Sequence, residues 1–190
     1  AGISCELREV VLRDRPPSLK EYSPKATVPI IVLGDGTVID ESLDVMLWAL
    51  EQKDPDGWLT PEKGSIEEMR ALVVANDSDF KGNLDRYKYP DRYDDVDPLH
   101  HRNEAERFLA DLDGRIQKHG QLFGPTPSLA DIAIAPFIRQ FANTNREWFD
   151  SIGYNALKEW FEKFLALPLF ESVMGKYPQW QEGDPPTLIP

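Results

Sequence analysis

Short apolar runs separated by turn-forming residues open the chain, a pattern that is typical of strands. Residues 6–12 predict one strand, and the apolar run at residues 30–33 predicts a second. The second run is too short for a helix and rich in β-branched residues, so we expect it to be buried. Residues 34–36, Gly-Asp-Gly, tolerate the positive φ of a tight hairpin. Residues 37–39 are then the return strand.

Helical spacing begins directly after this hairpin. Glu41-Ser42 precedes an apolar stripe and predicts a helix from Ser42 to about Lys53. The free N–H groups at such a helix start suit a carboxylate. The Glu41 carboxylate can accept hydrogen bonds from an ammonium group. This junction therefore suits a peptide end that carries both groups.

Val28-Pro29 stands at the mouth of the second strand. A proline in this position can hold a cis bond, which turns the amide and carbonyl of the preceding residue outward. Val28 would then present an open backbone edge to which an extended peptide can pair as an added strand.

Residues 54–64 are rich in Pro, Gly and Asp and predict a linker. We therefore expect a first domain at residues 1–53 and an all-α domain at residues 65–190. Ser65, Asp97 and Ser128 are expected to cap helices. A nearly all-apolar helix at residues 132–141 belongs in the core, and an irregular tail is expected at residues 179–190.

Residues 23–43 resemble the glutathione transferase family, in which a turn, Val-Pro, a hairpin and Glu-Ser follow in this order. A second pattern, Gly124-x-x-x-Ser128-x-x-Asp131 followed by apolar residues, resembles the family's signature in its helical domain. The resemblance implies an α/β thioredoxin-like N-terminal domain and an all-α C-terminal domain. It gives Ser128 and Asp131 a structural role.

The resemblance also implies the ligand. Val28, with Pro29 in cis, would pair with the cysteinyl backbone of glutathione, while Glu41 and Ser42 would hold its γ-glutamyl end. Glutathione would be a co-substrate, because its thiolate is a nucleophile that can attack a small hydrophobic electrophile. By resemblance we further expect a homodimeric transferase that acts in detoxification.

The thioredoxin-like domain is expected to be incomplete. In the family it opens with a strand and a helix that precede residues 6–12 and that the sequence does not show. The Tyr, Ser or Cys that acts on the glutathione sulfur lies at the end of that first strand, so the catalytic residue is unknown and expected outside the chain. Cys5 lies at the entry to the next strand, and we expect a small buried or edge residue there.

Composition narrows the classes of partner. The net charge is −12, which argues against nucleic acid and anionic membrane surfaces because both need a basic footprint. The one cysteine cannot form an internal disulfide, so a cytoplasmic location is expected. His100 and Glu104 have metal-compatible spacing without an evident third ligand, so we expect no metal site.

Two other functions fit the same residues. The chain can be a non-catalytic glutathione transferase-like module for binding or assembly, because fold does not fix function. It can also be a glutathione-dependent thiol reductase, which needs a cysteine on the absent strand. Residues 77–93 alternate cations with tyrosines. They either line a pocket for the electrophile or form a solvated segment in which Tyr and Arg pack together, and we favour the second interpretation.

Overall fold

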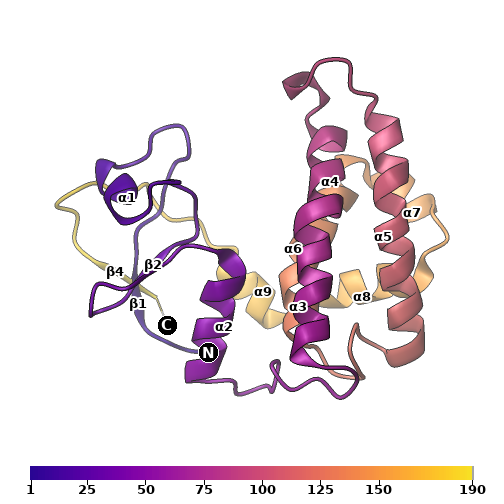
Figure 1. Cartoon of the computed structure of the whole chain (residues 1–190), viewed down its shortest axis with the longest axis horizontal. Coiled ribbons are helices and arrows are strands. Elements are labelled where there is room, and N and C mark those ends of the chain that lie inside the picture. The colour runs from indigo at the N-terminus through magenta and orange to yellow at the C-terminus, as the bar shows by residue number, and fades with distance from the viewer. Residues whose placement is uncertain (190) are drawn as a thin grey trace. The chain divides into compact units, whose positions relative to one another are not determined.

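The computed structural model describes residues 1–189 and contains two compact units. The first unit comprises residues 1–56 together with the chain from Gly175 onward, and the second comprises Gly57–Met174. Figure 1 shows strands and short helices in the first unit and a bundle of helices in the second. The C-terminal residues, which we expected in the helical domain, thus group with the first unit.

Short elements make up the first unit. They are β1 (Cys5–Leu7), α1 (Pro17–Tyr22), β2 (Ile31–Val32), β3 (Val38–Ile39), α2 (Ser42–Gln52) and β4 (Thr187–Ile189). The first two strands are shorter than predicted, because each continues only while a neighbouring strand pairs with it. The expectation of a buried second strand is wrong, since Val32 is 39% exposed.

The hairpin between β2 and β3 confirms the turn prediction. Ile31 pairs with Ile39 and Val32 with Val38 in antiparallel register. The loop closes with hydrogen bonds from the Leu33 amide to the Thr37 carbonyl (2.8 Å) and from the Gly36 amide to the Leu33 carbonyl (2.9 Å). Gly36 has a φ of 86°, a conformation that glycine adopts without steric cost.

The C-terminal segment pairs with β1, where the sequence predicted only an irregular tail. β4 lies antiparallel to β1, with Glu6 opposite Leu188. The amide of Trp180 donates to the carbonyl of Glu9 at 3.0 Å. Figure 1 shows this yellow segment running back beside the indigo N-terminal chain. The tail prediction was therefore wrong for the strand, and its last residue, Pro190, lies outside the described residues.

The second unit consists of helices, as predicted. They are α3 (Ile66–Ala75), a π-helical turn (Asn76–Phe80), α4 (Lys81–Lys88), a 3₁₀ turn (Pro90–Arg92), α5 (Pro98–His119), α6 (Leu129–Thr144), α7 (Arg146–Ser151), α8 (Asn155–Leu165) and α9 (Pro168–Val173). The three predicted caps are confirmed. Ser65 accepts from the Glu68 amide, and Asp97 accepts from the Leu99 amide. Ser128 and Asp131 form a reciprocal capping box at the start of α6.

Helix α6 is the core of the second unit, and Asp131 ties that core together. One carboxylate oxygen of Asp131 accepts from the Leu122 amide (3.0 Å) and from the Trp160 indole (2.9 Å). The other oxygen accepts from the amide and the hydroxyl of Ser128 (2.9 and 2.7 Å). Asp131 is 2% exposed. Burial raises the pKa of the Asp131 carboxyl, and these hydrogen bonds oppose that shift. One side chain thus joins a loop, a helix cap and α8.

We expect Asp131→Asn to lower the free energy of unfolding by about 1–3 kcal/mol, because an amide nitrogen would face buried donors that then lack an acceptor. Urea unfolding followed by far-UV circular dichroism measures this. Asp111→Asn is the matched control, since Asp111 makes an exposed pair with Arg115 at 2.8 Å and should change stability by less than about 0.5 kcal/mol. Equal losses in the two variants would contradict the role given to Asp131.

Candidate functional site

A tight turn after α1 is held to the end of β3. The hydroxyl of Ser23 donates to a carboxylate oxygen of Asp40 at 3.1 Å, and Ser23 is 1% exposed. The Ala26 amide donates to the Ser23 carbonyl at 2.9 Å. Asp40 directly follows β3 and precedes the first residues of α2. The partly buried bond therefore fixes the turn beside the place where α2 begins.

Ala26 keeps a conformation that usually requires glycine. Its φ is 49°, in the left-handed region, and the residue is 3% exposed. For a residue with a Cβ this region costs about 1–2 kcal/mol. The turn thus retains a left-handed residue although alanine stands where the family commonly has glycine.

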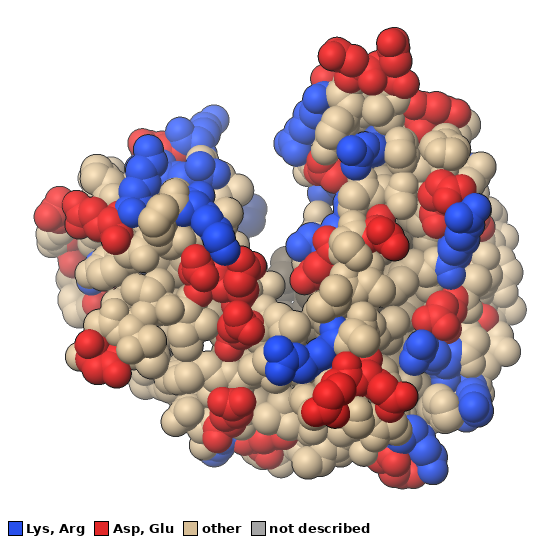
Figure 2. All heavy atoms as spheres, in the orientation of Figure 1, with Lys and Arg blue, Asp and Glu red and all other residues tan. Residues whose placement is uncertain are grey.

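A second link, between charged groups, lies on the surface of this junction. The Lys25 ammonium is 2.5 Å from a carboxylate oxygen of Glu41 and 3.8 Å from one of Asp40. The hydrogen bond to Glu41 raises the pKa of the Lys25 ammonium, and the charges of Asp40 and Glu41 add to the shift. In the view of Figure 2, basic side chains of the first unit lie next to acidic ones. The pair contributes little stability because both groups are exposed.

The start of α2 is confirmed at Ser42, with Glu41 as the residue before the helix. Glu41 caps no helix amide with its side chain. Ser42 is exposed. The N–H groups in the first turn of a helix have no intrahelical partner and lie at the positive end of the dipole. This end of α2 can therefore hold a carboxylate.

Three residues after Lys25, the chain reaches the Val28–Pro29 bond, which is cis as predicted. Val28 is 44% exposed. Among residues 1–189, no hydrogen bond engages the Val28 amide or carbonyl. Its backbone is free to pair with an extended peptide, as the added strand of a sheet does.

The four predicted residues thus come from one connected region. Val28 and Pro29 follow the turn, Glu41 and Ser42 begin α2, and the Lys25 contact with Glu41 brings these two segments together. Sequence reasoning missed Ser23, Lys25 and Asp40, which make this connection. The available signal was one lysine in a turn shortly before an adjacent pair of acids, which is weak without knowledge of the fold.

Residues 77–93 show Tyr and Arg packed together, as we favoured. The Arg86 guanidinium lies 4.8 Å from the ring centre of Tyr93, and that of Arg92 lies 3.8 Å from the ring centre of Tyr89. Tyr93 also donates a hydrogen bond to Asp85. This segment is largely helical, because the π-helical turn after Ala75 continues directly into α4.

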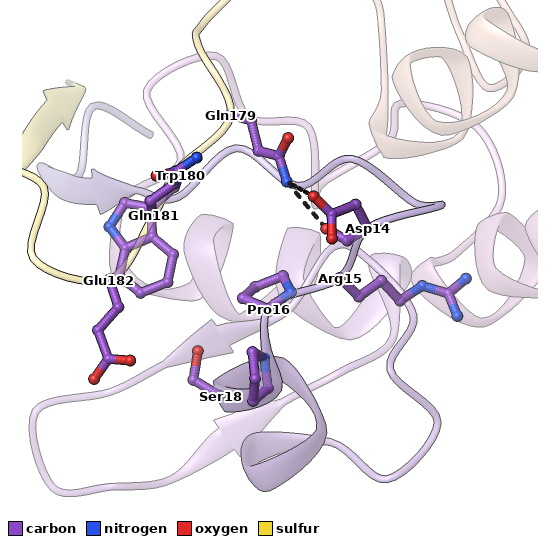
Figure 3. Close-up of a pocket in the computed structure, with 9 residues that line it drawn as sticks. Asp14, Arg15, Pro16, Ser18, Gln179, Trp180, Gln181 and Glu182 are labelled. Carbon is purple, nitrogen blue, oxygen red and sulfur yellow. Dashed lines mark hydrogen bonds between the residues drawn. The ribbon is translucent and has the colours of Figure 1, made fainter.

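A pocket of about 250 Å³ lies elsewhere in the first unit, between the chain before α1 and the C-terminal segment. Figure 3 shows the Gln179 amide directed at Asp14, where it donates to the carboxylate at 3.0 Å and to the backbone carbonyl at 3.1 Å. The Arg8 guanidinium lies 4.6 Å from the Trp180 ring centre. None of the four predicted residues lines this pocket. We therefore place the candidate site at the start of α2.

Cys5 lies in β1, carries a free thiol and is exposed. It is thus an edge residue, one of the two alternatives expected. No helix among the described residues is long and apolar enough to span a membrane.

Comparison with known families agrees with this architecture. The model of the glutathione S-transferase N-terminal domain matches residues 1–52, and that of the C-terminal domain matches residues 68–163. The chain therefore belongs to the glutathione S-transferase family. No curated protein matches the sequence.

Solved structures show the same fold. A glutathione transferase from Phanerochaete chrysosporium in complex with oxidized glutathione has a TM-score of 0.71 at 17% identity, covering 84% of this chain and 76% of the other. A family member from Pseudomonas fluorescens with two glutathione bound has a TM-score of 0.69 at 21% identity, covering 83% and 74%. A glutathione S-transferase from Rhodospirillum rubrum has a TM-score of 0.69 at 21% identity, covering 92% and 81%.

We expect Ser23→Ala to lower the free energy of unfolding by about 1 kcal/mol, because it removes the partly buried hydrogen bond between the turn and Asp40. Urea unfolding measures the loss. Ser4→Ala is the control, since Ser4 is exposed and makes no hydrogen bond with the described residues. A Ser23→Ala variant as stable as the control would show that this bond does not hold the junction.

Proposed function

We propose that this chain binds glutathione at the junction between the Ser23 turn and the start of α2, and that it conjugates the glutathione thiol to an electrophile. The observation that carries the proposal is the exposed residue Val28, whose backbone amide and carbonyl make no hydrogen bond within residues 1–189. Beside it, the start of α2 offers a carboxylate for an ammonium and free N–H groups for a carboxylate. An extended peptide pairs with Val28, while Glu41 accepts from its ammonium and Ser42 donates to its carboxylate. Membership of the glutathione S-transferase family supports this assignment.

Two of the similar structures contain glutathione, which adds support from proteins of the same fold. The substrate is inferred from the chemistry of the site. Glutathione carries an ammonium and a carboxylate on one carbon at its γ-glutamyl end, and its cysteinyl backbone is extended next to them. Glu41 and Ser42 are complementary to the charged γ-glutamyl end of the ligand, and the Val28 backbone is complementary to the cysteinyl residue that follows it.

Conjugation forms a bond between the glutathione sulfur and the electrophilic carbon, and the leaving group departs with the bonding electrons. The thiol proton passes to solvent. Because the thiolate is the nucleophile and a free thiol is only slightly ionised at neutral pH, a bound thiol must be stabilised as its anion. The residues assigned above hold and orient the peptide, and we assign none of them to thiol activation.

The family and the composition support two further parts of the proposal. We expect a homodimer, as members of the family form, in a reducing cytoplasm that suits one unpaired cysteine. Light scattering coupled to size exclusion tests the dimer, and a monomer at micromolar concentration would contradict it.

We expect Ser42→Ala to weaken glutathione binding at least about tenfold, because a hydrogen bond to a charged group contributes about 1.5–3 kcal/mol when it is made. Isothermal titration calorimetry measures the dissociation constant. Ser172→Ala, on the second unit, is the control and should bind as the wild type does, since Ser172 donates only to the Leu169 carbonyl. Unchanged affinity of the Ser42 variant would reject its assignment.

Catalysis is tested separately from binding. An aryl halide activated by nitro groups should yield the glutathione thioether, detected by mass spectrometry at a rate above that of the buffer. Cys5→Ser should leave that rate unchanged, because the conjugated sulfur belongs to glutathione. A chain that binds glutathione but forms no thioether would be a binding module, and loss of turnover in Cys5→Ser would indicate thiol chemistry at Cys5.

A further inference from the structure

The group proposed to receive the ligand ammonium already holds an ammonium from the protein itself. Glu41 pairs with Lys25 at 2.5 Å, and this is its one ion pair within residues 1–189. Lys25 also lies 3.8 Å from Asp40. Lys25 therefore occupies the place at Glu41 that the cationic end of the peptide would take. A ligand ammonium competes with Lys25 for this oxygen of Glu41, because the lysine already pairs with it at 2.5 Å.

The geometry of the ion pair permits that movement. The Lys25 side chain is 57% exposed and that of Glu41 is 61% exposed, so no packing holds the pair. Lysine carries a compact charge on a flexible four-carbon chain, and this ammonium can reorient while its backbone stays fixed. The backbone is fixed by the partly buried Ser23 bond to Asp40 and by the Ala26 amide. Lys25 can therefore change its partner without leaving the junction.

The chemistry of the ligand supplies a new partner. In a γ-glutamyl group, the α-ammonium and the α-carboxylate are bonded to the same carbon. When the ammonium pairs with Glu41, the carboxylate is brought to the same end of α2, within reach of the displaced lysine. Asp40 and Glu41 make this end acidic, so a nearby cation strengthens the hold that the helix N–H groups have on an arriving carboxylate.

We propose that Lys25 exchanges partners when glutathione binds: it releases Glu41 to the ligand α-ammonium and pairs with the ligand α-carboxylate. This inference rests on the proposed function and adds a specificity-determining residue to it. Lys25 pairs with Glu41 before the ligand binds and with the ligand carboxylate afterwards. A ligand end that carries both charges therefore binds without a net loss of ion pairs. A ligand with the ammonium alone displaces Lys25 from Glu41 and offers it no new anionic partner, so Lys25 keeps its longer 3.8 Å contact with Asp40.

The test compares two ligands with the full chain by calorimetry at low salt. One is glutathione. The other is the same peptide with 4-aminobutanoyl in place of γ-glutamyl, which keeps the ammonium and lacks the α-carboxylate. We expect Lys25→Met to leave glutathione binding nearly unchanged, because the variant lacks one ion pair both before and after the ligand binds. The same substitution should tighten binding of the second peptide about three- to fivefold, the upper range of an exposed ion pair, because the competing ammonium is gone.

Two variants control the comparison. Lys20→Met removes one positive charge from an exposed position on α1 and should affect neither ligand. Lys25→Arg keeps the charge and should preserve the preference for glutathione. Added salt should reduce the preference in the wild type and have little effect on it in Lys25→Met.

The outcomes separate this inference from the proposed function. A wild-type chain that binds neither peptide overturns both. Wild-type binding of glutathione, together with a Lys25→Met variant that keeps the wild-type preference for glutathione over the second peptide, overturns the exchange alone.

Discussion

The partly buried hydrogen bond between Ser23 and Asp40 is the constraint on which the candidate site depends. It joins the turn after α1 to the chain between β3 and α2 across sixteen intervening residues, and it is shielded from solvent on the Ser23 side. With that bond in place, Lys25 reaches Glu41 and the Val28 backbone follows in a fixed register. Without it, an exposed ion pair alone would hold the two halves of the site, and such pairs contribute at most about 1 kcal/mol.

The local signals in the sequence predicted this region well because each has a steric or hydrogen-bonding cause. Gly36 marks the positive φ of the hairpin, Ser42 the helix start, and Pro29 the cis bond. The links between those segments were not predictable in the same way. Nothing in the spacing of Ser23 and Asp40 indicates that they meet, because their contact depends on how α1 and the hairpin pack.

The limits of the sequence are clearest at β1 and β4. A strand needs a partner, and β1 ends at Leu7 because the antiparallel partner Thr187–Ile189 covers only three residues. The apolar pattern of residues 6–12 predicted a longer strand. Such a pattern indicates which side chains are buried, and it does not indicate which residues pair with a neighbouring strand. The tail lies far away in sequence and is rich in proline, which indicated irregular chain. Its pairing is a long-range contact that no local pattern encodes.

The second unit shows the opposite case, in which one motif predicts much of the packing. The Ser128–Asp131 capping box starts α6, and the same carboxylate reaches Leu122 and Trp160. Capping boxes are local and therefore readable from sequence, whereas the Trp160 contact required the fold. One buried acid thus joins three parts of this unit, while the proposed binding site lies among exposed groups of the other unit.

The most direct test of the account is a map of backbone amide shifts by nuclear magnetic resonance as glutathione is added to the isotope-labelled chain. We expect the amides of Val28, Ser42 and Leu43 to shift with one common saturation curve, and those of α8 to stay unchanged. Shifts confined to the pocket between Asp14–Ser18 and Gln179–Glu182, with Val28 and Ser42 unaffected at saturation, would contradict it.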